Sequence, residues 1–149
     1  MIVYMDRASI ESLTVKDIRE IVVKQSYQMK YRKLERYYVG DHDILHSERT
    51  DKTGGDNRIV NNMARYITDT ATGYFLGQPV VYSSENEEYL QTIQDIFDYN
   101  DEQDHNTELG KQCSIKGDCF EMLYLDEDGR IRLGLVFPEN LILFYETES

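Results

Sequence analysis

Residues 57–79 read Asn-Arg-Ile-Val-Asn-Asn-Met-Ala-Arg-Tyr-Ile-Thr-Asp-Thr-Ala-Thr-Gly-Tyr-Phe-Leu-Gly-Gln-Pro, which is the clearest helical pattern in the chain. Asn57 can cap the start of this helix, because its side-chain oxygen accepts an orphan backbone amide. Gly77 followed by Pro79 predicts the end of the helix through a left-handed cap. Gly73 costs about 1 kcal/mol inside a helix relative to alanine, and its presence predicts a closely packed neighbouring helix.

Apolar side chains recur at helical spacing in this segment and predict one buried stripe. We therefore expect Ile67 in the core, where a substitution by aspartate would bury an unpaired charge and unfold or aggregate the domain. The stripe consists of Val60, Met63, Ala64, Ile67, Ala71, Tyr74 and Phe75.

The composition predicts one domain spanning residues 1–149, with an aromatic core built from twelve tyrosines and five phenylalanines. No apolar run approaches the roughly 18 residues that a membrane span requires, and Met1–Leu13 lacks a signal-peptide pattern. The two cysteines, Cys113 and Cys119, lie six residues apart, and reduced intracellular thiols are the favoured interpretation.

The net charge of −12 is unevenly distributed along the chain. Residues 1–40 carry eight basic and five acidic side chains, whereas residues 80–149 carry four basic and seventeen acidic ones. A surface this acidic repels nucleic acid instead of holding it. Stable nucleic-acid binding by most of the chain is therefore disfavoured, although the passage of DNA past the protein is not.

The segment before Thr14 shows no periodic pattern. Thr14 and Asp17 then form a weak capping box, which predicts a long helix that runs to about Val39 and is ended by Gly40. The apolar positions of its two halves do not share a face, so we expect this helix to bend or to change partners. Basic side chains alternate with tyrosines here and leave two interpretations open. One is a nucleic-acid or partner-helix surface, and the other, favoured, is a solvated face with tyrosine anchors. The basic residues are Lys24, Lys30, Arg32, Lys33 and Arg36.

Residues 41–56 are polar, contain Gly54 and Gly55, and predict a loop that is either functional or mobile. His42 and His46 lie four apart beside two aspartates, but no framework supplies further ligands. We therefore expect no metal site in this loop.

Two acidic helices follow the central one. Residues 80–83 predict a short strand, and Ser84 with Glu87 forms a capping box for the next helix. A second helix is expected from Asp101 to Lys116, with Gly117 as its C-cap. The apolar face of the first consists of Tyr89, Leu90, Ile93, Ile96 and Phe97.

The last third of the chain reads as β-structure. Residues 119–125 and 130–137 flank Asp126-Glu-Asp-Gly129, a strong hairpin signal. Residues 141–145 can add a third strand, which would complete a C-terminal β-meander with an exposed edge. The fold class is thus α+β, with several helices packed on a small antiparallel sheet.

The sequence contains no catalytic constellation, phosphate-binding glycine loop, nucleophile elbow or paired-cysteine motif. Cys113 and His105 would lie about 12 Å apart along one helix, too far to form a hydrogen bond. We therefore predict no catalytic, cofactor-binding or metal-ligating residues, no cofactor, and no hydrolase or nucleotide-binding activity.

Several motifs together resemble the portal proteins of tailed bacteriophages, more narrowly the family of long-tailed phages and prophages of Gram-positive bacteria. The resemblance is carried by the run from Asn57 to Asn62, by residues 66–70 and by residues 73–80. Shorter matches in the same order lie at residues 37–40 with His42 after them, and at residues 97–100, 104–106, 117 and 124–129. Its key residues are Asn57, Arg58, Asn61, Asn62, Asp69, Gly73, Tyr74, Gly77, Pro79, Asn106, Gly117, Asp126 and Gly129.

The resemblance implies a structural protein of the portal vertex and not an enzyme. Portal subunits form a ring, usually of twelve, through which double-stranded DNA is packaged and ejected. The implied partners are other subunits, the packaging terminase, and capsid, scaffold and head-completion proteins, without a membrane. The implied location is the virion, and the host cytoplasm during assembly.

The chain would be the N-terminal, wing-like part of a longer protein, monomeric or weakly associated alone. The alternative is a stand-alone intracellular interaction domain or a truncated prophage remnant without a ring.

Overall fold

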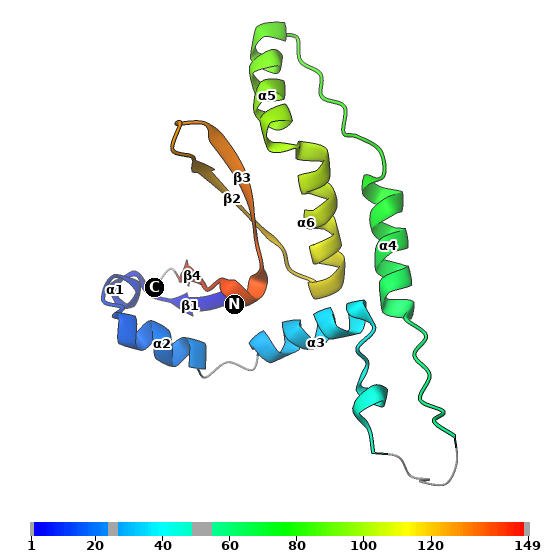
Figure 1. Cartoon of the computed structure of the whole chain (residues 1–149). Coiled ribbons are helices and arrows are strands. Elements are labelled where there is room, and N and C mark those ends of the chain that lie inside the picture. The colour runs from blue at the N-terminus through cyan, green and yellow to red at the C-terminus, as the bar shows by residue number, and fades with distance from the viewer. Residues whose placement is uncertain (1, 24–26, 49–54, 148–149) are drawn as a thin grey trace.

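The computed structural model describes residues 2–23, 27–48 and 55–147 (Figure 1). These residues form an α+β fold, which confirms the predicted class. The α-helices are α1 (Arg7–Glu11), α2 (Val15–Val23), α3 (Tyr27–Val39), α4 (Met63–Leu76), α5 (Glu87–Asn100) and α6 (Glu102–Lys116). The strands are β1 (Ile2–Met5), β2 (Phe120–Leu125), β3 (Ile131–Val136) and β4 (Leu143–Glu146), and the 3₁₀ turns are η1 (Asp43–His46) and η2 (Pro138–Asn140).

Helix α6 occupies the middle of the molecule, with α4 alongside it and α3 crossing below both (Figure 1). Gly110 allows the close approach of α6 to α4, because a Cβ atom there would overlap the Leu76 side chain. The core between these helices is small and mixed in polarity. Its buried members among the described residues are Tyr31, Thr68, Thr72, Gln112, Ile115, Lys116 and Pro138.

The apolar stripe of α4 is not the buried face of that helix. Ile67 is 60% exposed and Phe75 is 82% exposed, whereas Thr68 and Thr72 face α6 and are buried. Small threonine side chains let two helices approach closely, and the periodicity of large apolar residues does not reveal that preference. The predicted burial of the stripe, and of Ile67 in particular, is therefore wrong for this chain.

Several predicted helix ends are confirmed. Thr14 and Asp17 form a reciprocal capping box, in which the Asp17 carboxylate accepts from the Thr14 amide over 2.9 Å. Gly40 ends α3 with a positive φ of 90°, and the Asp41 amide donates to the Arg36 carbonyl over 2.8 Å, as in a Schellman cap. Gly117 ends α6 with a φ of 82°, a left-handed conformation that favours glycine.

Other helix boundaries differ from the prediction because a neighbouring asparagine takes the cap. Asn62, and not Asn57, caps α4 by accepting the Arg65 amide over 3.0 Å. Asn86, and not Ser84, caps α5 by accepting the Tyr89 amide over 3.0 Å. Gly77 ends α4 with a φ of −73°, so the predicted left-handed cap is wrong at that position.

The chain also departs from the predicted segments at three places. Residues 80–83 form no strand, and the lead before Thr14 forms β1 and α1. The long helix expected from Thr14 to Val39 is divided into α2 and α3, and its residues 24–26 lie outside the described part of the chain. The two unaligned apolar faces of this segment are consistent with two helices that have different partners.

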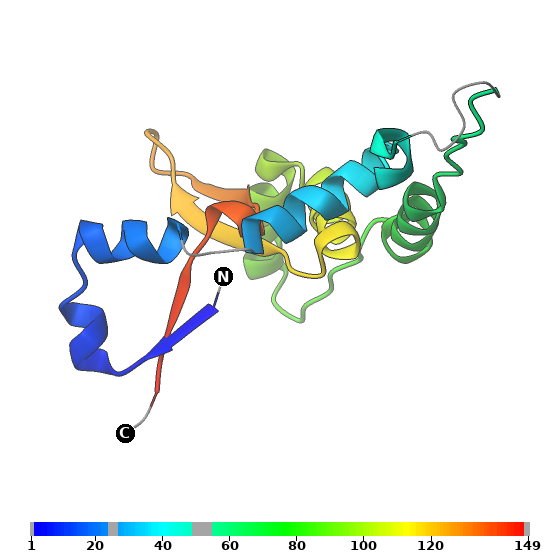
Figure 2. The same cartoon turned by 90° about the horizontal axis from the view of Figure 1, so that it is seen from below.

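The predicted hairpin is present, but the predicted meander is not. Strands β2 and β3 pair antiparallel, with Phe120 opposite Val136 and Leu125 opposite Ile131. The η2 turn at Pro138 then redirects the chain, and β4 pairs in parallel with β1 in a separate two-stranded sheet. This second sheet lies with α1 and α2, away from α4 (Figure 2). A pairing between the two ends of the chain leaves no local signal, which explains the error.

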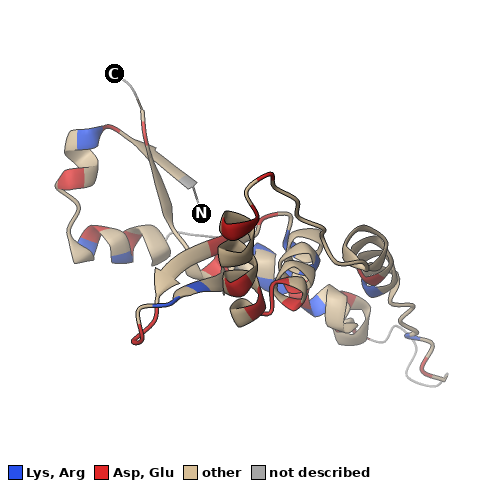
Figure 3. Cartoon of the chain, turned by 90° about the horizontal axis from the view of Figure 1, so that it is seen from above, with Lys and Arg blue, Asp and Glu red and all other residues tan. Residues whose placement is uncertain are grey.

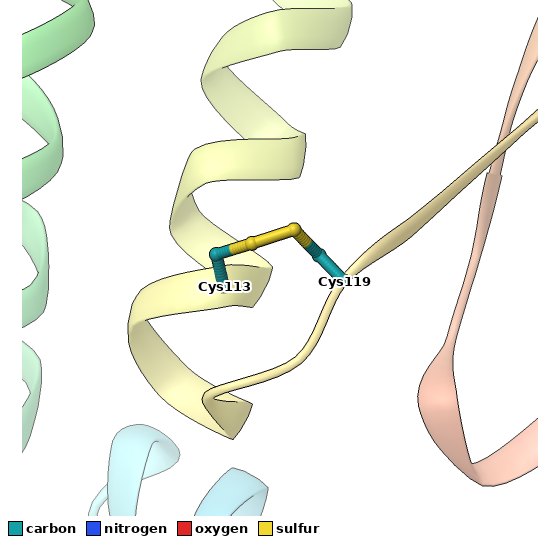
Figure 4. Close-up of a disulfide and its surroundings, with 2 residues drawn as sticks. All are labelled: Cys113 and Cys119. Atoms are coloured by element: carbon teal, nitrogen blue, oxygen red, sulfur yellow. A yellow bond between two sulfur atoms is a disulfide. The ribbon is translucent and has the colours of Figure 1, made fainter. Parts of the chain in front are cut away.

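Cys113 and Cys119 form a disulfide, with their Cα atoms 4.9 Å apart (Figure 4). The left-handed turn at Gly117 reverses the chain after α6 and returns Cys119 to the level of Cys113. The expectation of two reduced thiols is therefore wrong for this structure. The disulfide fastens the end of α6 to the start of the β2–β3 hairpin.

Lys116 joins three elements at the base of the molecule. Its side chain is only 2% exposed, and its Nζ lies 2.7 Å from the Glu139 carboxylate of η2. The same Nζ lies 3.5 Å from the carboxylate of Glu35 on α3 and 4.5 Å from the centroid of the Phe137 ring. A buried ammonium requires such partners, so this cluster fixes α3, α6 and η2 relative to one another.

We predict that Lys116→Ala lowers the free energy of unfolding by about 3 kcal/mol, because two carboxylates lose their buried cation. The lysine stem also loses its packing against Phe137. Urea denaturation measures the change. Lys111→Ala is the matched control on the same helix, where a more exposed lysine pairs with Glu108 and the expected loss is under about 1 kcal/mol. Equal losses for the two variants would contradict the role assigned to Lys116.

Candidate assembly surfaces

Asn62 forms a polar joint between the end of α3 and the start of α4. Its Nδ2 donates to the Tyr38 carbonyl over 2.8 Å, while its Oδ1 accepts the Arg65 amide over 3.0 Å. Gly40 leaves room for this side chain, because a Cβ there would lie 3.2 Å from the Asn62 Nδ2. One amide side chain thus satisfies an orphan carbonyl and an orphan amide at the two helix ends.

Tyr38 extends this joint along α4. Its hydroxyl donates to the Asp69 Oδ1 over 2.8 Å, and Arg65 approaches the other carboxylate oxygen at 3.3 Å. Partial burial, together with the bond to Asp69, raises the pKa of Tyr38, and the same bond lowers the pKa of Asp69. The Lys111 ammonium of α6 lies 5.5 Å from the centroid of the Tyr38 ring, so the joint contacts all three central helices.

Arg58 clamps the segment before α4 to the η1 turn. Its guanidinium donates to the carbonyls of Leu45 and Ser47 over 3.0 and 3.2 Å. It also donates to both carboxylate oxygens of Asp56, at 2.9 and 2.6 Å. These bonds, with one from the Arg58 amide, lower the pKa of Asp56 to about 2.

The histidines of the loop between α3 and α4 have structural neighbours. His42 stacks on Tyr37 with ring centroids 4.6 Å apart, and His46 pairs with Asp41. Among the described residues, no group of three or more His, Cys, Asp or Glu side chains is placed to hold a metal ion. Of the expected mobile segment 41–56, residues 49–54 lie outside the described part of the chain, and mobility of the remainder stays a prediction.

An open groove of about 470 Å³ lies between α3, α4 and α6. Its walls are mainly apolar, and two lysines of α3 stand at its border. Lys33 binds Asp43 over 2.8 Å, whereas Lys30 forms no ion pair within the residues that the structure describes. The groove is lined by Lys30, Lys33, Leu34, Tyr37, Tyr38, Ala64, Ile67, Thr68, Ser114 and Ile115.

The β2–β3 hairpin presents a second apolar surface. Leu123 and Leu125 of β2 are each about two-thirds exposed. The outer edge of β3 is covered by Asn100, whose side chain donates to the Ile131 carbonyl over 2.9 Å and accepts from the Leu133 amide over 2.9 Å. Figure 3 shows acidic residues at the turn of the hairpin, opposite in charge to the lysines of the groove.

The residues that carry the portal resemblance occupy several places. Asn62 and Asp69 both bond to Tyr38 at the joint, and Arg58 holds the loop next to it. Tyr74 is almost fully exposed. Among the other positions, Gly117 ends α6, Asp126 and Gly129 belong to the turn of the hairpin, and Asn106 donates to Glu102 within α6. Their role as a shared family motif stays a prediction.

Gly110 and Lys116 both organise the core, but neither belongs to a motif in the sequence. Gly110 lies within α6, and threonines recur along α4. In the sequence, such a combination is only a weak indication that two helices pack closely. Lys116 follows an apolar residue at the end of α6, where a basic side chain normally complements the helix dipole in solvent. The sequence alone therefore gives no reason to expect its burial.

Among the described residues, none of the helices combines the length and the hydrophobicity that a membrane span requires. The family described as "Phage portal protein, SPP1 Gp6-like" matches residues 23–149. The chain is also similar to the portal protein of Bacillus phage SPP1, with 30% identity over 125 residues. This alignment covers 76% of the chain but only 24% of that relative, so the chain spans about a quarter of its length.

We predict opposite effects for alanine at two glycines of the α4 segment. Gly73 lies inside the helix with nothing within 4 Å of an added Cβ, so Gly73→Ala should stabilise the chain by about 0.5–1 kcal/mol. This clearance overturns the expectation of a neighbour packed against Gly73. At Gly77 an added Cβ would collide with the backbone carbonyl of Gly73, and Gly77→Ala should destabilise. Thermal unfolding compares the two, and shifts of the same sign would contradict this geometry.

The Arg58 clamp also predicts a pH dependence. Because the pKa of Asp56 falls from 3.8 to about 2 on folding, the clamp stabilises the chain above about pH 4 and is lost as the pH falls toward 2. Carbon NMR of the Asp56 carboxyl follows its titration. Arg58→Gln should return the pKa toward 3.8, whereas the control Arg65→Gln should leave it unchanged. An equal response to the two substitutions would refute the assignment.

Proposed function

Because this chain belongs to the SPP1 Gp6-like family of phage portal proteins, we propose that it forms part of the ring through which phage DNA is packaged and ejected. The match over residues 23–149 is the observation that carries the proposal. The chain spans about a quarter of the SPP1 portal protein, and we assign it to a peripheral, wing-like part of one subunit.

The exposed apolar surface of α4 supports a role in assembly. Ile67, Tyr74 and Phe75 are all more than half exposed on a helix whose small polar residues face the core. Clustered apolar exposure of this kind marks surfaces that other protein segments cover. In our proposal those segments belong to the remainder of the portal subunit or to its neighbours.

The charge distribution fits a subunit that DNA passes without being gripped. Residues 80–149 carry seventeen acidic and four basic side chains, and acidic residues lie along α5 and at the hairpin turn (Figure 3). Such a surface repels the phosphate backbone. We therefore assign this part of the chain to the outside of the ring and not to the wall of its channel.

The proposed partners follow from this role. They are the other subunits of a ring, usually twelve, the packaging terminase, and capsid, scaffold and head-completion proteins. The proposed location is the portal vertex of the virion, and the host cytoplasm during assembly. We also propose that the chain acts without catalysis. In the structure His105 binds Glu121 over 2.7 Å, and Cys113 is joined to Cys119.

We predict that the full gene product forms rings of about twelve subunits, whereas the 149-residue chain alone sediments mainly as a monomer at micromolar concentration. The reason is that the acidic surface of residues 80–149 repels other copies, although salt screens this repulsion beyond about 10 Å at 0.1 M. Electron microscopy and analytical ultracentrifugation test both statements. A gene product that stays monomeric would overturn the portal proposal. A stable ring of the 149-residue chain would refute the predicted weakness of its self-association.

A further inference from the structure

We propose that the turn end of the β2–β3 hairpin of one copy docks into the groove between α3, α4 and α6 of a neighbouring copy. This contact rests on the proposed ring for its setting, because the contact alone is too weak to hold two copies of the 149-residue chain together at micromolar concentration. The two surfaces are complementary in both polarity and charge, and they lie on one chain.

The groove supplies an apolar floor that this chain leaves open. Leu34 from α3, Ile67 from α4 and Ile115 from α6 converge on it. Ile115 is buried at its base, whereas Ile67 is 60% exposed at its side. Covering such a surface removes apolar area from water, which is the main driving force of association between proteins.

The hairpin supplies apolar side chains near its turn. Leu125 lies opposite Ile131 across the two strands, and Leu123 lies two residues along on the same face. All three are exposed. The hairpin is also fixed to the end of α5, because the Asn100 side chain hydrogen-bonds to the backbone of β3. A rigid projection loses little conformational freedom on docking.

Charge sets the orientation of the hairpin in the groove. Lys30 and Lys33 stand at the groove border, and Glu127 and Asp128 stand at the hairpin turn. Asp126 is already occupied by the amides of Asp128 and Arg130 and by the Tyr99 hydroxyl. Glu127 and Asp128 are therefore the carboxylates that would face Lys30, the lysine without an ion pair among the described residues.

The position of the two surfaces requires a head-to-tail contact. The hairpin lies on one side of α6 and α4 on the other, in both views (Figures 1 and 2). The hairpin therefore points away from the groove of its own chain. A contact between two different surfaces of one chain is heterologous, and such contacts close into rings when the rotation permits.

The test is a double cysteine variant of the full gene product, Ile67→Cys with Leu125→Cys, treated with a short bismaleimide. Cys113 and Cys119 are joined and do not react with maleimide. Head-to-tail docking should give a denaturing-gel ladder of covalent multimers, because each copy links to the next. The matched control, Val81→Cys with Leu125→Cys, moves one cysteine to a more exposed site outside the groove and should give no ladder.

A charge reversal then tests the orientation. Lys30→Glu in the double cysteine variant should reduce the ladder at least tenfold, because like charges would then face each other across the contact. Adding Glu127→Lys and Asp128→Lys should restore it. Intact rings without a ladder would overturn the docking contact and leave the portal proposal standing. A ladder from a gene product that forms no closed ring would support the docking contact and overturn the portal proposal.

Discussion

The buried ammonium of Lys116 is the constraint on which the arrangement of the chain depends. It is almost free of solvent contact, and a charge in that position must be matched by partners that cannot move away. Glu35 comes from α3 and Glu139 from η2, so the requirement fixes both elements against the end of α6. The disulfide one turn earlier on α6 fixes the start of the hairpin to the same place. The helices, the hairpin and the turn toward β4 therefore share one anchor.

Local rules were enough to predict the elements whose ends are set by neighbouring residues. Gly40 and Gly117 end their helices, and the turn at Gly129 closes the hairpin, because these positions need a positive φ that glycine adopts without strain. The α+β class followed from the order of such elements. The cap of α4 lies five residues after the predicted one, because the segment contains three asparagines and Asn62, the one that caps the helix, also donates to the Tyr38 carbonyl. That partner is distant in sequence.

Long-range features escaped prediction for the same physical reason. The parallel pairing of β1 with β4 joins the two ends of the chain, and no spacing within either strand indicates it. The apolar stripe of α4 was identified correctly as a pattern, but a pattern does not say what covers it. Here α6 packs on Thr68 and Thr72, because Gly110 and the small threonines allow a closer approach than the stripe would. The surfaces that we propose for assembly can be recognised only once that choice is known.

This choice also connects the fold with the proposed role. A chain of this size normally buries its large apolar side chains in its own core, yet Ile67, Tyr74 and Phe75 remain outside the core. The helices are instead held by polar contacts, the Asn62 joint and the Lys116 cluster, which specify geometry without using those side chains. An arrangement of this kind leaves the apolar faces free for other protein segments while the subunit keeps a defined shape. Because polar contacts hold these helices together, the apolar periodicity of α4 marks the surface that we propose other subunits cover, and not the interior of this chain.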